Sequence, residues 1–202
     1  MYAYGADVKF TAHLGTTYTN RTVEIWANPY GGDRPDKLIR TGKVDSHGNI
    51  SATVDMTRDT DVTAVFKGDA RYKPKTVKST GYAHVKNSTV VSKNYKTAKI
   101  GSTTYYWFHK KTSPLVTTTM SYYPGRKERI DLQVYYNGKW YTAEGSPQYF
   151  KLASNGTCAV SLGAPGTSGI KARVRSSYIN NSSGDNVNTT TYGSWKYLYF
   201  TS

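Results

Sequence analysis

The feature of this sequence that most limits its fold is a repeated alternation of apolar and polar residues. In residues 8–14 the apolar side chains Val8, Phe10, Ala12 and Leu14 occupy every second position, and residues 50–56 repeat the pattern. A period of two places alternate side chains on opposite faces of an extended strand, whereas a helix needs a period of about 3.6. No stretch has a convincing helical period. The sequence therefore predicts an all-β protein.

Turn-forming residues separate the predicted strands at intervals of roughly 8–12 residues, a spacing typical of a β-sandwich. Asn137–Gly138 and Asn155–Gly156 are the strongest hairpin signals. Residues 180–191, rich in Ser, Asn and Thr, are expected to form a long mobile loop. The predicted strands are residues 8–14, 22–27, 38–44, 50–56, 61–66 and 77–85, then 103–109, 115–120, 129–136, 139–142, 149–152, 157–162, 170–178 and 195–201.

The length suits two consecutive domains of about 100 residues each. Residues 86–99 are polar and thin in core residues, so we place the boundary there and predict domains 1–88 and 89–202. Cys158 is the only cysteine, so the chain forms no internal disulfide, and its position in an alternating strand predicts a small buried hydrophobe.

The stretch VFKGDARYKP, residues 65–74, follows a strand and a Gly–Asn turn at residues 48–49. An aromatic strand end followed by Gly–Asp, tyrosine and proline resembles bacterial immunoglobulin-like domains, and the likeness covers residues 5–86. The second half looks like the β-sandwich domains that accompany such repeats in secreted actinobacterial proteins, on the basis of residues 138–140, 169–178 and 194–197.

The resemblance implies two tandem antiparallel immunoglobulin-like β-sandwiches without a catalytic apparatus or cofactor. It also implies a secreted or cell-surface protein, with any signal peptide removed or outside this chain. In VFKGDARYKP we expect Gly68, Asp69 and Tyr72 to form a structural corner, in which the carboxylate accepts backbone N–H groups and the tyrosine hydroxyl bonds to the backbone.

The net charge is +14, and residues 87–202 carry 14 bases against four acids. No acid occurs between Asp69 and Glu128, whereas that interval holds 12 bases. Such a field favours anionic partners, although lysines that guard strand edges against aggregation give the same pattern. The candidate residues for binding an anionic partner are Arg71, Lys73, Lys75, Lys93, Lys96, Lys99, Lys110 and Lys111.

Aromatic residues concentrate in the second half, which holds 13 of the 19 tyrosines and three of the four tryptophans. Adjacent rings in one strand point to opposite faces, so one of each pair faces outward. Trp107, Tyr123 and Tyr136 are the candidates for contact with a sugar or a protein partner. Cross-strand aromatic pairs that only shield the sheet are the alternative.

Other chemistries lack the residue patterns that they need. The four histidines show no metal-ligand spacing, the sequence GxSxG of a nucleophile elbow is missing, and Glu128 and Glu144 are not arranged as a glycosidase pair. No motif for sequence-specific nucleic-acid recognition and no apolar run long enough for a membrane span occurs.

The sequence thus favours a non-enzymatic extracellular interaction or adhesion module, part of a larger secreted or surface protein or assembly. The expected partner is an anionic polymer or a protein. A carbohydrate-binding module and a purely structural spacer remain as alternatives.

Overall fold

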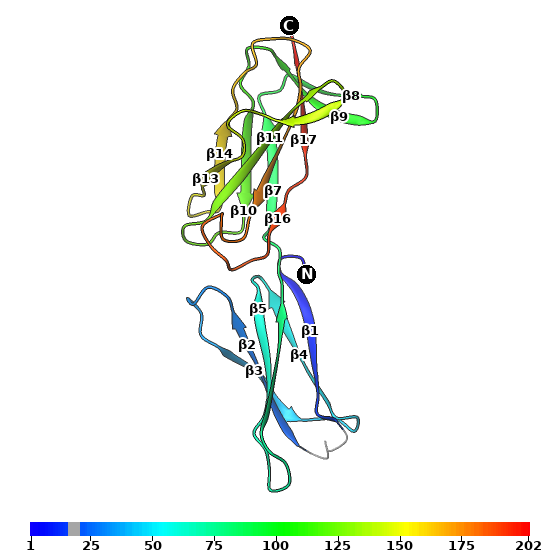
Figure 1. Ribbon diagram of the computed structural model, residues 1–202, viewed down its shortest axis with the longest axis vertical. Coiled ribbons are helices and arrows are strands. Elements are labelled where there is room, and N and C mark those ends of the chain that lie inside the picture. The colour runs from blue at the N-terminus through cyan, green and yellow to red at the C-terminus, as the bar shows by residue number, and fades with distance from the viewer. Residues whose placement is uncertain (16–20) are drawn as a thin grey trace. The chain divides into compact units, whose positions relative to one another are not determined.

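The computed structural model describes residues 1–15 and 21–202, and these ranges form β-strands without an α-helix (Figure 1). The prediction of an all-β fold is confirmed: the sheets are mostly antiparallel and pack as β-sandwiches. The chain divides into two compact units, the first comprising residues 1–85 and 186–189, the second residues 86–185 and 190–202. This differs from a division into 1–88 and 89–202 at residues 86–88, which lie in the second unit, and at residues 186–189, which lie in the first.

The first unit contains a two-stranded and a four-stranded antiparallel sheet. β1 pairs with β4, with Phe10 opposite Ala52, and the second sheet has the order β3-β2-β5-β6. Both β1 and β6 are edge strands of their sheets. The strands are β1 (Ala6–His13), β2 (Thr22–Pro29), β3 (Lys37–Lys43), β4 (Asn49–Met56), β5 (Thr60–Phe66) and β6 (Lys75–Gly81).

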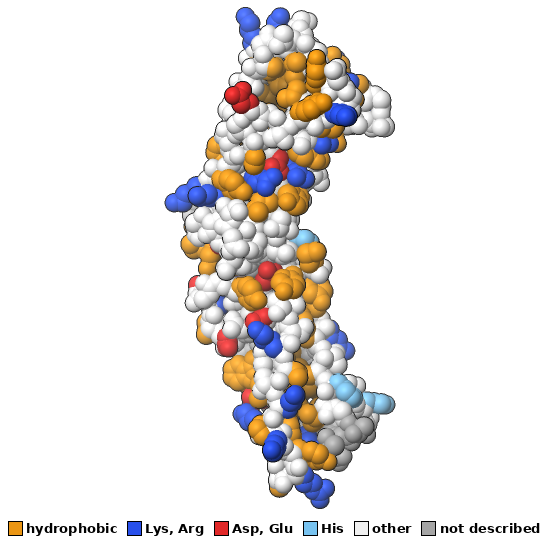
Figure 2. All heavy atoms as spheres, in the orientation of Figure 1, with side chains coloured by type: hydrophobic (Ala, Val, Ile, Leu, Met, Phe, Trp, Pro, Cys, Tyr) orange, Lys and Arg blue, Asp and Glu red, His pale blue; other side chains and the backbone are white. Residues whose placement is uncertain are grey.

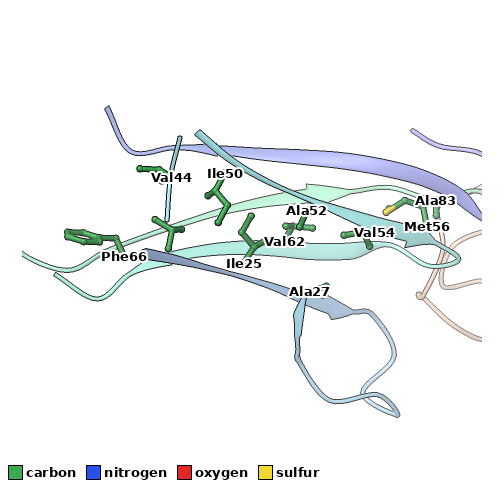
Figure 3. Packing of buried hydrophobic residues seen from close by; sticks show 11 residues of the cluster. Ile25, Ala27, Val44, Ile50, Ala52, Val54, Met56, Val62, Phe66 and Ala83 are labelled. Carbon is green, nitrogen blue, oxygen red and sulfur yellow. The ribbon is translucent and has the colours of Figure 1, made fainter. Parts of the chain in front are cut away.

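The core of the first unit lies between these two sheets, as Figure 3 shows. Ile25 of β2 and Met56 of β4 are buried almost completely. The alternation seen in the sequence explains this core, because the inward face of each strand carries its apolar residues.

Residues 186–189 belong to the first unit and are held there by hydrogen bonds. The Asp59 amide donates to the Val187 carbonyl over 2.9 Å, and Asn188 Nδ2 donates to the Ala83 carbonyl over 3.2 Å. Val187 and Asn188 are each 1% exposed. Within the expected loop of residues 180–191 this segment is thus buried and makes tertiary hydrogen bonds, which composition does not reveal.

The second unit packs a three-stranded sheet, β14-β10-β7, with a larger sheet of order β12-β11-β15-β17-β9-β8. β13 also pairs with β11, and β16 with β15. All pairs are antiparallel except β9 with β17, which is parallel. The strands are β7 (Asn87–Ser92), β8 (Lys96–Ile100), β9 (Thr103–His109), β10 (Leu115–Met120), β11 (Lys127–Tyr136), β12 (Lys139–Thr142), β13 (Gln148–Lys151), β14 (Thr157–Ser161), β15 (Lys171–Tyr178), β16 (Thr191–Tyr192) and β17 (Lys196–Thr201).

The core of the second unit gathers around Phe108, Val116, Val174 and Leu198, each at most 1% exposed. Cys158 of β14 is only partly buried, which differs from the expected buried position, because β14 is the edge strand of its sheet. Among the residues that the structure describes, no helix could span a membrane.

Candidate functional site

The outward face of the larger sheet in the second unit carries a series of basic and aromatic side chains. On β15 the residues Ala172 and Val174 are buried in the core. Their neighbours Lys171, Arg173 and Arg175 must therefore project from the opposite face, because side chains alternate along a strand. All three keep partial solvent exposure.

Both arginines of β15 are layered between aromatic rings. The Arg173 guanidinium lies 4.5 Å from the Trp140 ring centroid and 4.4 Å from that of Trp195. The Arg175 guanidinium lies 4.4 Å from the ring centroids of both Trp195 and Tyr192. Planar guanidinium groups pack on aromatic faces in this way. We call the series Tyr192, Arg175, Trp195, Arg173, Trp140 the arginine–aromatic stack.

Hydrogen bonds to β11 fix the two arginines in place. Arg173 Nε donates to Gln133 Oε1 over 2.8 Å, and Arg175 Nε donates to Asp131 Oδ2 over 2.9 Å. Asp131 Oδ1 also accepts from Arg129 Nε over 2.7 Å. The single carboxylate of Asp131 thus binds both Arg129 and Arg175, so it compensates only half of their combined positive charge.

Aromatic contacts continue from the stack across the sheet. Trp140 packs against Tyr197 with ring centroids 5.8 Å apart, and Tyr197 is 5.5 Å from the ring of Tyr105. Burial, followed by the neighbouring Tyr197, raises the pKa of Tyr105. Trp107, the next ring on the same face of β9, meets Tyr199 edge-on at 4.5 Å, and Lys96 Nζ lies 4.3 Å from the Trp107 ring centroid.

These residues lie on neighbouring strands of one sheet, from β12 to β8, and together form what we call the outer face. Figure 2 shows basic and hydrophobic side chains intermixed on the surface of the second unit. The outer face holds the basic residues Lys96, Arg129, Lys171, Arg173 and Arg175, and the acid Asp131.

The basic residues singled out from the sequence occupy different places. Lys96 lies on the outer face, whereas Lys99, three residues further along β8, projects from the other face because a strand has a period of two. Lys93 lies in the turn before β8 with a φ of 69°, and Lys110 and Lys111 follow the end of β9.

Arg71 and Lys73 lie in the loop before β6, and Lys75 is its first residue, all three in the first unit. Because Lys93 lies in a turn and Lys96 and Lys99 project from opposite faces of β8, the three-residue spacing of these lysines does not produce one basic surface.

The three candidate aromatic residues are also separate. Trp107 belongs to the outer face. Tyr136 lies at the end of β11 in the β11–β12 hairpin and is 68% exposed. Tyr123 lies in the loop before β11, with its ring centroid 5.8 Å from the Arg126 guanidinium, outside the outer face.

The residues around Asp69 form a tightly bonded turn. Asp69 Oδ1 accepts hydrogen bonds from the backbone N–H groups of Arg71 and Tyr72, over 2.8 and 2.9 Å. Asp69 Oδ2 accepts from Arg21 Nε over 2.6 Å, and these bonds, that of Arg21 first, lower the pKa of Asp69.

Gly68 has a φ of +84°, and a Cβ there would meet the Tyr72 carbonyl oxygen at 2.9 Å. The Tyr72 ring packs under the Arg21 guanidinium at 4.3 Å. The carboxylate is thus engaged in shaping the chain, as a corner requires.

Sequence reasoning missed Arg173, Arg175, Trp140 and Trp195. A signal was present, because Lys171, Arg173 and Arg175 follow the period of two on the polar side of an alternating strand. Their aromatic partners lie 17 to 33 positions away along the chain, so only the strand order brings them together. Among the residues that the structure describes, no group of three or more His, Cys, Asp or Glu side chains could hold a metal ion.

Comparison with known proteins gives no family. No family model matches the chain, and no curated protein matches it. A solved structure similar to this chain is that of a DUF3823 family protein from Bacteroides uniformis ATCC 8492, with 8% identity, 96% of this chain and 100% of that chain covered, and a TM-score of 0.32. A likeness at that level carries no argument about function.

Proposed function

We propose that the protein is a non-enzymatic extracellular binding module whose outer face binds an anionic polymer. The observation that carries the proposal is the arginine–aromatic stack, in which two guanidinium groups are held in fixed positions between three rings. The sequence resemblance to secreted immunoglobulin-like repeats supports the extracellular setting and a role in adhesion.

The charge and rigidity of the outer face suit an extended anion. Five basic side chains stand there against the one acid Asp131. An arginine that is already ordered loses little conformational freedom when it meets a sulfate or carboxylate, and its planar fork matches either group. The net charge of +14 would steer the polymer to the protein, and repeated contacts along one polymer would add avidity.

Binding to dextran sulfate, with uncharged dextran of the same length as the matched polymer, tests the proposal. We expect binding to dextran sulfate only, with an affinity that falls steeply between low and high salt because the ion pairs are exposed. Replacing Lys96 and Lys171 by Gln should weaken it at least fivefold, since both lie beside rings of the outer face.

The matched control replaces Lys9 and Lys43 by Gln, two exposed lysines of the first unit, and changes the net charge equally. Equal losses in both double variants would show that net charge alone drives binding, and the outer face would be rejected as the site.

A carbohydrate-binding module is the second candidate, because Tyr136 and Tyr141 of the β11–β12 hairpin are 68% and 51% exposed. Exposed rings stack on sugar faces irrespective of charge. That function predicts binding to uncharged dextran or another neutral glycan, insensitive to salt and lost on Tyr136→Ala. A structural spacer would bind neither polymer.

A further inference from the structure

The second unit also has a cleft on the inward side of β11, opposite to the outer face. Its volume is about 310 Å³, and its apolar lining is Ile130, Leu132, Phe150, Val160 and Leu162. The rim is formed by Glu144, Gly145, Ser146, Gln148, Ser161 and Gly163. This volume is at the lower end of the range of ligand pockets, roughly 300–1,000 Å³.

The cleft opens because the edge of β11 changes its partner. On one edge of β11, β13 pairs with residues 127–130 and β12 pairs with residues 133–136. Asp131 and Leu132 therefore have no strand beside them on this edge, although both pair with β15 on the other edge. The loop that joins β12 to β13 bridges the gap instead. Its Ser146 Oγ accepts from the Leu132 amide over 2.9 Å, and the Ala143 amide donates to the Leu132 carbonyl over 2.9 Å.

The apolar wall of the cleft belongs to the hydrophobic core of the second unit, and part of it remains exposed to solvent. Ile130 at the base is 4% exposed, whereas Leu132, Phe150, Val160 and Leu162 are only partly buried against the same cluster. They come from both sheets of the sandwich, since Val160 lies on β14 and Phe150 on β13. Covering such a surface is favourable, because apolar area leaves water.

The rim carries a carboxylate whose position is unusual in this unit. Residues 86–202 contain four acids, Glu128, Asp131, Glu144 and Asp185. Asp131 and Asp185 are paired with arginines and Glu128 is fully buried. Glu144 is exposed at the mouth of the cleft, and none of the ion pairs found among the described residues includes it.

We propose that this cleft binds a small hydrophobic cation, an alkyl or aryl chain that ends in an ammonium group. The chain occupies the apolar space between β11, β13 and β14, and the ammonium group pairs with Glu144 at the rim. Apolar contact provides most of the affinity, and charge complementarity selects the head group, because a carboxylate next to low-dielectric walls interacts more strongly than one in open water. The site is separate from the outer face and does not depend on its function.

Three probes with one aryl chain and different head groups test the site: 4-phenylbutylamine, 4-phenylbutan-1-ol and 4-phenylbutyrate. Dissociation constants come from NMR titration of backbone amides, in which the signals of Gly145 and Gly163 report on the rim. We expect the amine to bind about fivefold more tightly than the alcohol and the carboxylate to bind most weakly. Equal binding of all three, or tightest binding of the carboxylate despite Glu144, would overturn the proposal.

Two variants separate the head-group contact from the apolar contact. Glu144→Gln should weaken the amine about fivefold and leave the alcohol unchanged, whereas Asp7→Asn, which removes an exposed carboxylate of the first unit, should change neither. A Cβ at Gly163 meets nothing within 4 Å, so the fold tolerates Gly163→Leu, and because Gly163 lines the cleft the larger side chain should narrow its mouth and weaken all three probes. Unchanged amide spectra away from the cleft show that each variant is folded. Amine binding that persists in both variants would place the ligand elsewhere and reject the cleft.

Discussion

Arg126 and Asp185 form a bidentate ion pair that is almost completely withdrawn from solvent. Arg126 Nε lies 2.8 Å from Asp185 Oδ2 and Arg126 Nη2 lies 2.8 Å from Asp185 Oδ1, with side chains 1% and 3% exposed. Arg126 Nη1 donates to the Ser121 carbonyl over 2.6 Å, and the Tyr178 hydroxyl donates to Asp185 Oδ1 over 2.7 Å. The pair therefore joins the β10–β11 loop, the β15–β16 loop and strand β15 of the second unit.

Asp185→Asn should destabilise the second unit by about 3–5 kcal/mol, because it leaves the buried Arg126 charge uncompensated. Urea unfolding followed by tryptophan fluorescence measures it, since three of the four tryptophans lie in this unit. The comparison is Asp33→Asn, which breaks a pair whose carboxylate is 48% exposed. That change should leave the unfolding midpoint of the first unit almost unaltered, and similar losses for both variants would contradict the explanation.

The stability of the second unit should depend on pH through Glu128. Burial raises the pKa of Glu128, and Thr118, Cys158 and Ser176 beside it offset this only in part. Among the described residues neither carboxyl oxygen has a partner at hydrogen-bond geometry. The folded protein thus holds this proton to a higher pH than the unfolded chain does, so the stability is present below about pH 4.5 and lost as the pH rises through the folded-state pKa.

Glu128→Gln removes this dependence, because Gln resembles the protonated side chain and cannot ionise. The difference in unfolding free energy between variant and wild type should grow in favour of the variant from about pH 4.5 upward, by about 1.4 kcal/mol for each unit of pKa shift. Urea unfolding at a series of pH values gives this curve. A difference that stays constant between pH 4 and 8 would show that Glu128 is ionised in the folded protein.

Cys158 should react slowly with alkylating reagents. Burial, with the adjacent Glu128 second, raises the pKa of the Cys158 thiol to about 12, and the thiolate is the reactive form. At pH 8 we expect iodoacetamide to modify the folded protein roughly a thousandfold more slowly than the protein in urea, because the thiolate fraction falls tenfold per pKa unit. Mass spectrometry over time measures both rates, and comparable rates would mean that the thiol is accessible and ionised.

Trp195 should contribute to stability through both arginines of the stack. Its ring lies 4.4 Å from each guanidinium, so Trp195→Ala removes two cation–π contacts of about 0.5–1 kcal/mol each, in addition to the packing of the ring. Trp195→Phe keeps a ring between the arginines and should lose less. Thermal unfolding followed by circular dichroism compares the two, and equal losses would assign the effect to the size of tryptophan alone.

Two glycines with almost the same φ should respond very differently to alanine. Gly138 and Gly156 have φ values of +77° and +79°, but a Cβ at Gly138 meets nothing within 4 Å, whereas one at Gly156 overlaps the Met120 carbonyl oxygen. Gly138→Ala should cost about 1–2 kcal/mol, the strain of a left-handed backbone. Gly156→Ala should cost at least twice as much, because β10 must also move. The urea concentrations at the unfolding midpoint of the two variants measure these losses. Equal shifts would show that the backbone at Met120 moves away from the new Cβ at little cost.

Most of the strands could be predicted because their information is local. Burial alternates along β10, at Val116, Thr118 and Met120, and the predicted limits of this strand, 115–120, agree with the structure. The Asn137–Gly138 hairpin joins β11 to β12 as expected, since both residues adopt positive φ. Such patterns depend only on neighbours along the chain.

The partners in the site could not be predicted in the same way. Arg126 and Asp185 are 59 positions apart, and nothing local distinguishes this buried arginine from an exposed one. Glu128 precedes the predicted strand 129–136, so its position on the inward face became evident only from the true start of β11 at Lys127. Likewise, the grouping of Lys93, Lys96 and Lys99 came from sequence spacing, whereas the faces of β8 follow its pleat.

The position of β17 has a consequence for how the second unit is made. Residues 196–201 lie between β15 and β9 in the larger sheet, and among the strands that the structure describes they alone link the β8–β9 hairpin to the rest of that sheet. During synthesis on the ribosome, β8 and β9 emerge about 90 residues before the strand that joins them to β15. Until then β9 lacks its neighbour β17, and the inward residue Phe108 lacks its contact with Phe200. We therefore expect the larger sheet to reach its native order only after β17, the last strand in the chain order of this sheet, has been synthesised.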